Sequence, residues 1–265
     1  MTGGRRLVVF DMDGVIYRGG ERLPHVREVL AGVRGRGLKV RFLTNNSTKT
    51  REFYVERLRG MEVEAEVEEV ISSASATAWW IGKNAPGSVV YAVGEGGLKE
   101  ELAKVCRVLD GEDIEGVEYV VAGLDREFDY RKLTCAASAI YGGAKFIATN
   151  RDPNFPDSGG RVIPGGGSIV AAISVASGVE PLTIGKPEPL MFELMVEAVS
   201  VKREEILLVG DRASTDVALG RRAGVETCLV LTGVTTAEEV ESLPPELTPD
   251  HVISDLGGLM GILGL

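Results

Sequence analysis

The stretch Leu7-Val8-Val9-Phe10-Asp11-Met12-Asp13-Gly14 decides the fold of this 265-residue chain. Its short apolar run is typical of a buried strand in a parallel sheet. Asp11 and Asp13 follow at once, so two carboxylates stand at the carboxyl end of the strand, the edge where open α/β sheets bind ligands. Gly14 permits the tight reversal that turns both acids toward one point. Such a pair alone is also typical of a solvated turn, so the interpretation depends on its partners downstream.

Polar residues follow two other predicted strands. Thr44-Asn45-Asn46 comes after the strand expected over 40–43, and Asp211 comes after the strand expected over 206–209. Because the carboxyl ends of neighbouring parallel strands meet at one edge, we expect these side chains to converge with Asp11 on one crevice. Thr-Asn-Asn alone is also a common loop and helix-cap composition, and Asp211 with Asp216 could belong to a capped helix start.

A fourth element is Gly185-Lys186-Pro187-Glu188-Pro189, before an apolar helical face that includes Phe192. Pro187 suits the first turn of that helix. A Gly-Lys-Pro sequence by itself is more typical of a turn with a solvated lysine. The Gly-Lys-Pro sequence becomes informative because all four elements occur together in this order along the chain.

Apolar runs alternate with helical patterns almost throughout, which predicts an α/β fold with parallel sheets. Residues 26, 29, 30 and 33 form one apolar helical face, and a second α/β unit begins near 89–93. The simplest organisation is a core domain built from residues 1–80 and 181–265, with residues 81–180 inserted as a second domain.

Composition excludes several functional classes. The net charge of −10 disfavours nucleic acid and anionic membrane surfaces as partners. Three dispersed cysteines predict a reduced, cytoplasmic compartment, and only two histidines leave little material for histidine-based zinc or serine-protease chemistry. No stretch approaches the roughly 18 apolar residues that span a bilayer, so no membrane location is expected.

These residue types suit phosphoryl transfer. Asp11 and Asp211 can share a hard cation, and oxygen-only ligation favours Mg²⁺. A carboxylate can also act as a nucleophile that forms an acyl phosphate. Thr44 and Asn45 can donate hydrogen bonds to phosphoryl oxygens, and Lys186 adds a positive charge.

With these motifs in order, the chain resembles the haloacid dehalogenase superfamily of phosphohydrolases. Asp11-Met12-Asp13-Gly14-Val15, Thr44-Asn45-Asn46, Lys186 and Gly210–Asp216 match its four motifs in turn. More narrowly, the chain resembles the capped branch of 4-nitrophenylphosphatases and of phosphoglycolate and pyridoxal-phosphate phosphatases. Phrases typical of that branch are Thr44-Asn45-Asn46-Ser47, Ala148-Thr149-Asn150-Arg151-Asp152, Pro164-Gly165-Gly166-Gly167 and Gly185-Lys186-Pro187.

The resemblance implies a Rossmann-like hydrolase core with an inserted α/β cap domain. It also implies that Asp11 attacks phosphorus and that Asp13 acts as general acid and base. Thr44, Asn45, Asn46 and Lys186 would bind the phosphoryl group, and Mg²⁺ would be held by Asp11, the Asp13 carbonyl and Asp211. Asp216 would orient Lys186 or metal-bound water.

The expected function is therefore a Mg²⁺-dependent phosphomonoesterase that hydrolyses a small phosphorylated metabolite through an aspartyl phosphate. One alternative is a phosphotransferase or mutase with the same intermediate, and another is a non-catalytic binding module on this fold. The loop 149–156, with Arg151, Asp152 and Phe155, is the candidate surface for substrate selection, although Phe155 could instead pack in the core and Arg151 could be solvated. Capped relatives often pair through the cap, which makes a homodimer the candidate assembly.

Overall fold

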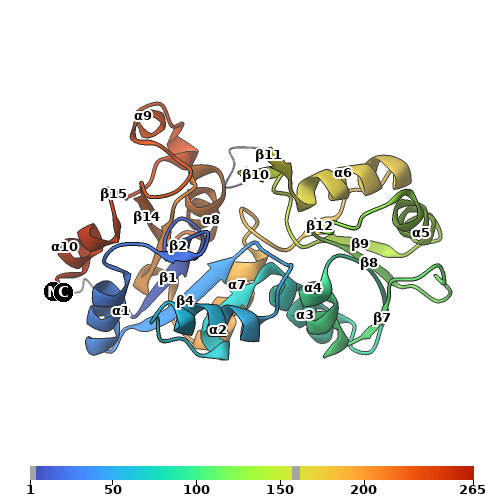
Figure 1. The fold of residues 1–265 in the computed structure, drawn as a ribbon, viewed down its shortest axis with the longest axis horizontal. Helices are drawn as coiled ribbons and strands as arrows, with labels where there is room; N and C mark the ends of the chain where they lie inside the picture. Colours follow the sequence, from blue (N-terminus) through green and yellow to red (C-terminus); the bar gives the residue numbers. More distant parts are fainter. Residues whose placement is uncertain (1–3, 157–161) are drawn as a thin grey trace. The chain divides into compact units, whose positions relative to one another are not determined.

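The computed structural model describes residues 4–156 and 162–265. The described residues form two compact units (Figure 1). Unit 1 comprises Met1–Thr44, Glu52–Ile71 and Lys186–Leu265, and unit 2 comprises Asn45–Arg51 and Ser72–Gly185. Each unit has a parallel sheet with helices, so the predicted Rossmann-like α/β class is confirmed.

Unit 1 contains a six-stranded sheet in the order β15-β14-β13-β1-β4-β5, in which the strands from β15 to β4 run parallel. A small antiparallel hairpin, β2-β3, follows β1. The strands of this unit are β1 (Leu7–Asp11), β2 (Tyr17–Arg18), β3 (Glu21–Arg22), β4 (Lys39–Thr44), β5 (Val70–Ser72), β13 (Ile206–Gly210), β14 (Glu226–Val230) and β15 (His251–Ile253). Its helices are α1 (Val26–Gly35), α2 (Arg51–Gly60), α7 (Leu190–Val199), α8 (Ala218–Ala223), α9 (Ala237–Val240) and α10 (Leu259–Leu263).

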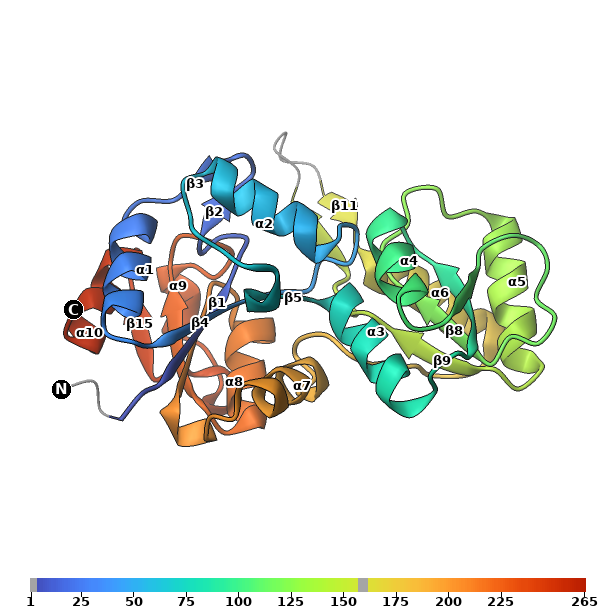
Figure 2. The same cartoon turned by 90° about the horizontal axis from the view of Figure 1, so that it is seen from below.

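Burial on both faces explains the apolar strands of this sheet. All five residues of β1 are buried, and α1 and α10 lie on the other side of the sheet from α7 and α8 (Figure 2). Val8 and Phe10 belong to the apolar cluster that includes buried residues of α1 and α10. The predicted helical face at residues 26, 29, 30 and 33 is buried, as its spacing requires.

Unit 2 contains a five-stranded parallel sheet in the order β12-β9-β8-β6-β7. A separate antiparallel pair, β10-β11, precedes α6. The strands are β6 (Val89–Val93), β7 (Arg107–Leu109), β8 (Tyr119–Ala122), β9 (Lys145–Ala148), β10 (Asn154–Pro156), β11 (Val162–Pro164) and β12 (Leu182–Thr183). The helices are α3 (Ser73–Asn84), α4 (Gly96–Ala103), α5 (Tyr130–Tyr141) and α6 (Gly166–Ser177).

The division into units differs in detail from the expected domain limits. Unit 2 begins at Ser72, and it also takes in the segment Asn45–Arg51. The roles of hydrolase core and cap, with limits at residues 80 and 181, stay a prediction. In the described part of the chain, no helix combines the length and the apolar character needed to cross a membrane.

Candidate active site

Three neighbouring strands of unit 1 end in polar residues at one edge of the sheet. β1 lies between β13 and β4, and all three run parallel. Asp11 at the end of β1 pairs with Leu43, the residue before Thr44, and Asp211 follows the last residue of β13. The strand order therefore places Asp11, Thr44 and Asp211 at the same carboxyl edge.

Lys186 joins two of the carboxylates. Its Nζ atom donates hydrogen bonds to Asp11 Oδ1 at 2.5 Å and to Asp216 Oδ1 at 2.6 Å, and all three side chains are buried. Burial alone would favour the neutral amine, but the charges of Asp11 and Asp216 outweigh it and raise the pKa of Lys186. Lys186 therefore stays charged inside the protein.

The proline next to this lysine does not start the helix that was expected there. Helix α7 begins at Leu190, and Pro189 occupies the position before it. Pro187 thus precedes the helix, and the prediction that it lies in the first turn is wrong. A second proline two residues later moves the helix start onward, because the residue before a proline is disfavoured in helical conformation.

A π-helical turn, Ala213–Val217, carries Asp216 toward Lys186. The second oxygen of this carboxylate accepts a hydrogen bond from the Arg212 backbone N–H at 3.1 Å. A Cβ atom at Gly210 would overlap the Asp216 side chain, so the chain needs glycine there. Both carboxylate oxygens of Asp216 are thus held, and its position beside Lys186 suits a group that orients the lysine.

Two glycines and one backbone N–H set the position of Asp211. Its Oδ2 atom accepts a hydrogen bond from the Val234 N–H at 2.8 Å. A Cβ atom at Gly14 or at Gly233 would overlap the Asp211 carboxylate, and Gly14 also has a φ of 85°. Burial, together with the nearby charge of Asp216, raises the pKa of Asp211 to about 6.

The contribution of Gly233 and Val234 was not predicted from the sequence. These residues lie in the loop after β14, a strand whose existence was predicted. β14 is parallel to β13, so its carboxyl end reaches the same edge of the sheet. Applying the strand-end argument to this fourth strand would have singled out the loop 231–235.

Asp13 lies in the turn that follows β1 and is exposed to solvent. The turn is closed by a hydrogen bond from the Gly14 N–H to the Tyr17 carbonyl at 2.8 Å. Nearby protein atoms remove part of the hydration of Asp13, which raises its pKa, and the charges of Arg57 and Arg18 oppose this effect. A raised pKa suits a group that must hold and release a proton.

The carboxylates of Asp11, Asp211 and Asp216 form a cluster that could hold a cation. One oxygen of each lies within 4.8 Å of the others. Burial raises the pKa of Asp11 well above its usual range, while the charge of Lys186 opposes that shift. The negative charge that three buried carboxylates carry when ionised exceeds the single positive charge of Lys186. Oxygen donors of this kind fit Mg²⁺. The side chain of Asp13 is not a member of this cluster of described residues.

The other predicted phosphate-binding residues, Asn45 and Asn46, belong to unit 2. Asn45 is buried, and its Nδ2 atom donates a hydrogen bond to Asp152 Oδ2 at 3.0 Å. Asn46 is exposed, and its Oδ1 atom accepts hydrogen bonds from the N–H and the hydroxyl of Thr48. The side chain of Asn46 therefore shapes a local turn.

The loop expected to select substrate has contacts of its own within unit 2. The guanidinium of Arg151 forms an exposed ion pair with Glu180, and Asp152 contacts Asn45. Phe155 lies in β10, opposite Ile163. The role of this loop in substrate selection stays a prediction.

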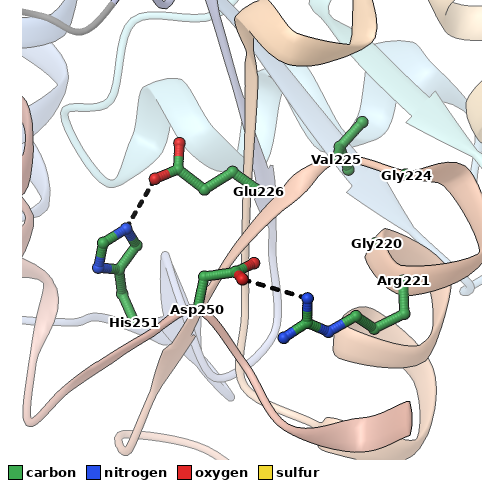
Figure 3. Close-up of a pocket in the computed structure, with 7 residues that line it drawn as sticks. All are labelled: Gly220, Arg221, Gly224, Val225, Glu226, Asp250 and His251. Atoms are coloured by element: carbon green, nitrogen blue, oxygen red, sulfur yellow. Dashed lines mark hydrogen bonds and ion pairs between the residues drawn. The ribbon is translucent and has the colours of Figure 1, made fainter.

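A surface pocket of about 460 Å³ lies elsewhere in unit 1 (Figure 3). His251 contacts Glu226 at 2.7 Å in this pocket, and Arg221 contacts Asp250 at 3.1 Å. The charged side chains are thus paired with one another, and none of the candidate site residues lines the pocket. Its lining residues are Gly220, Arg221, Gly224, Val225, Glu226, Asp250 and His251.

Comparison with known families shows which family the chain belongs to. The family model described as haloacid dehalogenase-like hydrolase matches residues 8–105, and a second model of HAD-like hydrolases matches residues 183–259. The chain belongs to the haloacid dehalogenase-like hydrolase family. The predicted resemblance is confirmed, and this haloacid dehalogenase-like chain is a phosphoric monoester hydrolase. The alternative of a non-catalytic binding module is thereby set aside.

Relatives of this haloacid dehalogenase-like hydrolase cover nearly its whole length. An acid sugar phosphatase from Staphylococcus saprophyticus is 39% identical over 91% of this chain and 92% of its own length. The 4-nitrophenylphosphatase from Thermotoga maritima has a TM-score of 0.92 and 35% identity, and the match covers 98% of each chain. The glycerol phosphate phosphatase from Mycobacterium tuberculosis, solved in complex with magnesium, has a TM-score of 0.88 and 31% identity over 97% of this chain and 76% of that one.

Proposed function

We propose that the protein is a Mg²⁺-dependent phosphomonoesterase that acts on small phosphorylated sugars or polyols through an aspartyl phosphate on Asp11. The observation that carries this proposal is the buried contact of Lys186 with both Asp11 and Asp216. An ammonium group at 2.5 Å from Asp11 Oδ1 favours the ionised carboxylate that a nucleophile requires.

In the first step, a carboxylate oxygen of Asp11 forms a bond to phosphorus while the bond from phosphorus to the ester oxygen breaks. Asp13 gives its proton to the departing oxygen. The raised pKa of Asp13 increases the protonated fraction that this step needs. Lys186 and donors of the Thr44–Asn45 peptide stabilise the negative charge on the phosphoryl oxygens.

In the second step, water attacks the phosphorus of the aspartyl phosphate. Asp13, now ionised, takes a proton from that water, and the bond between phosphorus and Asp11 breaks. Inorganic phosphate leaves, and Asp11 and Asp13 return to their starting forms. The same two carboxylates therefore complete both halves of the reaction.

Asp11, Asp211 and the backbone carbonyl of Asp13 would hold the Mg²⁺ ion. When bound, this ion would supply positive charge against the phosphoryl group and against the crowded carboxylates. The geometry supports this assignment, because one carboxylate oxygen of Asp211 lies within 4.8 Å of an oxygen of Asp11 and of Asp216. Asp216 would act on Lys186 through the contact at 2.6 Å.

The substrate class rests on the named relatives, which are an acid sugar phosphatase, a 4-nitrophenylphosphatase and a glycerol phosphate phosphatase. Their names share a phosphomonoester on a small organic group. We therefore place sugar phosphates and glycerol phosphate first among candidate substrates, with the loop 149–156 as the part of unit 2 that selects among them.

Hydrolysis of 4-nitrophenyl phosphate tests the proposal directly. The wild-type protein should release 4-nitrophenol with Mg²⁺ and stop when EDTA removes the metal. The Asp11→Asn variant should fold normally but lose turnover. Activity that survives in a purified Asp11→Asn protein would contradict Asp11 as the nucleophile.

Product analysis separates hydrolysis from phosphoryl transfer to another acceptor. With a competing alcohol present, hydrolysis yields inorganic phosphate in the same amount as 4-nitrophenol. A phosphotransferase would convert a large share of the substrate to the phosphorylated alcohol. Asp13 favours hydrolysis because it can activate water.

A further inference from the structure

The segment Asn45–Arg51 runs along the carboxyl edge of the sheet of unit 2. The carboxamide oxygen of Asn45 lies against Gly185, which follows β12, since a Cβ atom there would be 2.6 Å away. Ser47 Oγ lies in the same way against Gly123, which follows β8. Farther along, the Gly97 N–H in α4 donates to the Thr48 carbonyl at 3.1 Å. This edge is where open sheets commonly bind ligands, and here the chain itself lies along it.

The peptide carbonyl of Asn45 is held by two buried donors of unit 2. Ser73 Oγ donates to it at 2.5 Å, and Asn150 Nδ2 donates to it at 2.8 Å. The side chain of Asn45 is held separately, because its Nδ2 atom donates to Asp152 Oδ2 at 3.0 Å. The loop 150–152 thus contacts both the backbone and the side chain of one residue.

The two contacts from this loop are linked to each other. Asn150 Oδ1 accepts a hydrogen bond from the Asp152 N–H at 3.0 Å, so Asn45, Asn150 and Asp152 form a closed ring of hydrogen bonds. The Gly167 N–H donates to the Asp152 carbonyl at 2.9 Å, and a Cβ atom at Gly165 would overlap that carbonyl. Asp152 is therefore anchored to the start of α6 on one side and to Asn45 on the other.

A carboxylate can only accept hydrogen bonds, whereas a carboxamide has one end that donates and one that accepts. Asp152 consequently selects the orientation in which the nitrogen of the Asn45 side chain faces it. Such a bond to a charged group is about twice as strong as a neutral one. An aspartate at this position fixes the Asn45 carboxamide more firmly than a neutral side chain would.

We infer that Asp152 is a positioning residue for catalysis, which acts through Asn45 by holding the peptide that follows Thr44. This inference rests on the proposed function, in which that peptide donates to the phosphoryl group. Asp152 is half-buried, and Ser73, Asn150 and Gly97 hold the segment without it. Its loss should therefore loosen one side chain and leave the fold intact.

A double-mutant cycle between Asn45 and Asp152 tests the inference. We would measure kcat and KM for 4-nitrophenyl phosphate with Mg²⁺, and inhibition by inorganic phosphate, for Asp152→Ala, Asn45→Ala and the double variant. Asp152→Ala should lower kcat/KM and weaken phosphate inhibition by about tenfold, as expected for loss of a hydrogen bond to a charged group. The same substitution should change neither quantity further once Asn45 is alanine.

Two further variants serve as controls for this experiment. The kcat/KM and the phosphate inhibition of Asp152→Asn should lie between those of wild type and Asp152→Ala, because an amide oxygen can still accept the hydrogen bond but carries no charge. Asp110→Ala removes the exposed partner of Lys99, an ion pair of unit 2 outside the loop 149–156, and should leave kcat/KM and phosphate inhibition unchanged. All variants should keep the unfolding temperature of the wild type within a few degrees. If the rate of Asn45→Ala falls below detection, calorimetric titration with inorganic phosphate in the presence of Mg²⁺ completes the cycle.

Three results would overturn the inference. An undiminished kcat/KM in Asp152→Ala would show that the contact has no role in catalysis. A loss of equal size in the Asn45→Ala background would show that Asp152 acts by another route, such as direct contact with substrate. An Asn45→Ala protein with full activity would show that the Asn45 side chain, through which Asp152 acts, does not position the peptide that follows Thr44, because the substitution keeps the backbone N–H of that peptide. Failure of the proposed function would instead appear as a wild-type protein without Mg²⁺-dependent turnover.

Discussion

The Nζ atom of Lys186 lies 2.5 Å from Asp11 Oδ1, although 175 residues separate the two in the chain. The contact lies at the carboxyl edge of β1, where the structure also places Asp211 and Asp216. It supplies a fixed positive charge to the carboxylate proposed as the nucleophile.

Replacing Lys186 by methionine should abolish most of the activity. Loss of one charge that stabilises the phosphoryl transition state typically costs at least about a hundredfold in kcat. Stability should fall as well, because Asp11 and Asp216 lose their buried partner. Steady-state kinetics and thermal unfolding, on the same preparation, measure the two effects.

Lys132 offers a matched control in unit 2. It is also buried, and its Nζ atom lies 2.8 Å from Asp125 Oδ2; neither residue is one of the candidate site residues. Lys132→Met should lower stability to a similar degree while the folded protein keeps kcat within a few-fold of wild type. Equal losses of kcat in both variants would mean that Lys186 has only a structural role.

Gly233→Ala should weaken metal binding. The added Cβ would overlap the carboxylate of Asp211 and push it away from Asp11. Displacing a group that orients a metal ligand typically costs about 10–100-fold in metal affinity. The Mg²⁺ concentration that gives half-maximal activity should rise by that factor, and saturating Mg²⁺ should restore part of the rate.

Gly261 provides the control for this substitution, because a Cβ atom there meets no other atom within 4 Å. Gly261→Ala should leave both the rate and the Mg²⁺ requirement unchanged. A Gly233→Ala protein with the Mg²⁺ requirement of wild type would argue against Asp211 as a metal ligand.

Glu226 should make stability depend on pH in the acid range. Its hydrogen bond to Arg5, at 2.6 Å, lowers the pKa of Glu226 from its ordinary value of 4.5 in the folded protein. A carboxylate whose pKa is lowered by folding stabilises the folded protein in full at pH values above its ordinary pKa. This stabilisation disappears as the pH falls through the lowered pKa. Glu226→Gln should therefore cost about 0.5–1 kcal/mol at pH 7, since the pair is partly exposed, and little in acid.

Denaturant unfolding at neutral and acidic pH measures this difference. Glu193→Gln is the comparison, because Glu193 forms a looser, more exposed ion pair with Arg203 at 3.5 Å. That variant should change stability little at either pH. If the free energies of unfolding of wild type and Glu226→Gln differed by the same amount at both pH values, the ionic origin of the effect would be contradicted.

The sequence predicted the candidate site residues that lie at the carboxyl ends of strands. Apolar runs before Asp11, Thr44 and Asp211 indicated buried parallel strands, and parallel strands bring their carboxyl ends to one edge. The contact of Lys186 with Asp11 was not predictable at the level of atoms, because it depends on the packing of a segment 175 residues away. The family resemblance nonetheless singled out the lysine.

Other features of the structure could not be predicted from the sequence around them. The segment Asn45–Arg51 is grouped with unit 2 through contacts with Ser73, Gly97 and Asn150, all distant in the sequence. Gly233 is required because a neighbouring strand brings Asp211 against it. Loops such as these depend on long-range packing, whereas periodicity reports only on the face that a helix or strand buries.

The most direct test of the account is to trap the covalent intermediate in the Asp13→Ala variant. Because 4-nitrophenol is a good leaving group, phosphorylation of Asp11 should proceed without Asp13, while hydrolysis of the aspartyl phosphate should slow. Acid quenching after mixing with 4-nitrophenyl phosphate and Mg²⁺, followed by peptide mass spectrometry, locates the phosphoryl group. We expect a burst of one 4-nitrophenol per protein and a phosphoryl group on Asp11. A burst with the phosphoryl group on another residue, or steady release with no labelled peptide, would contradict it.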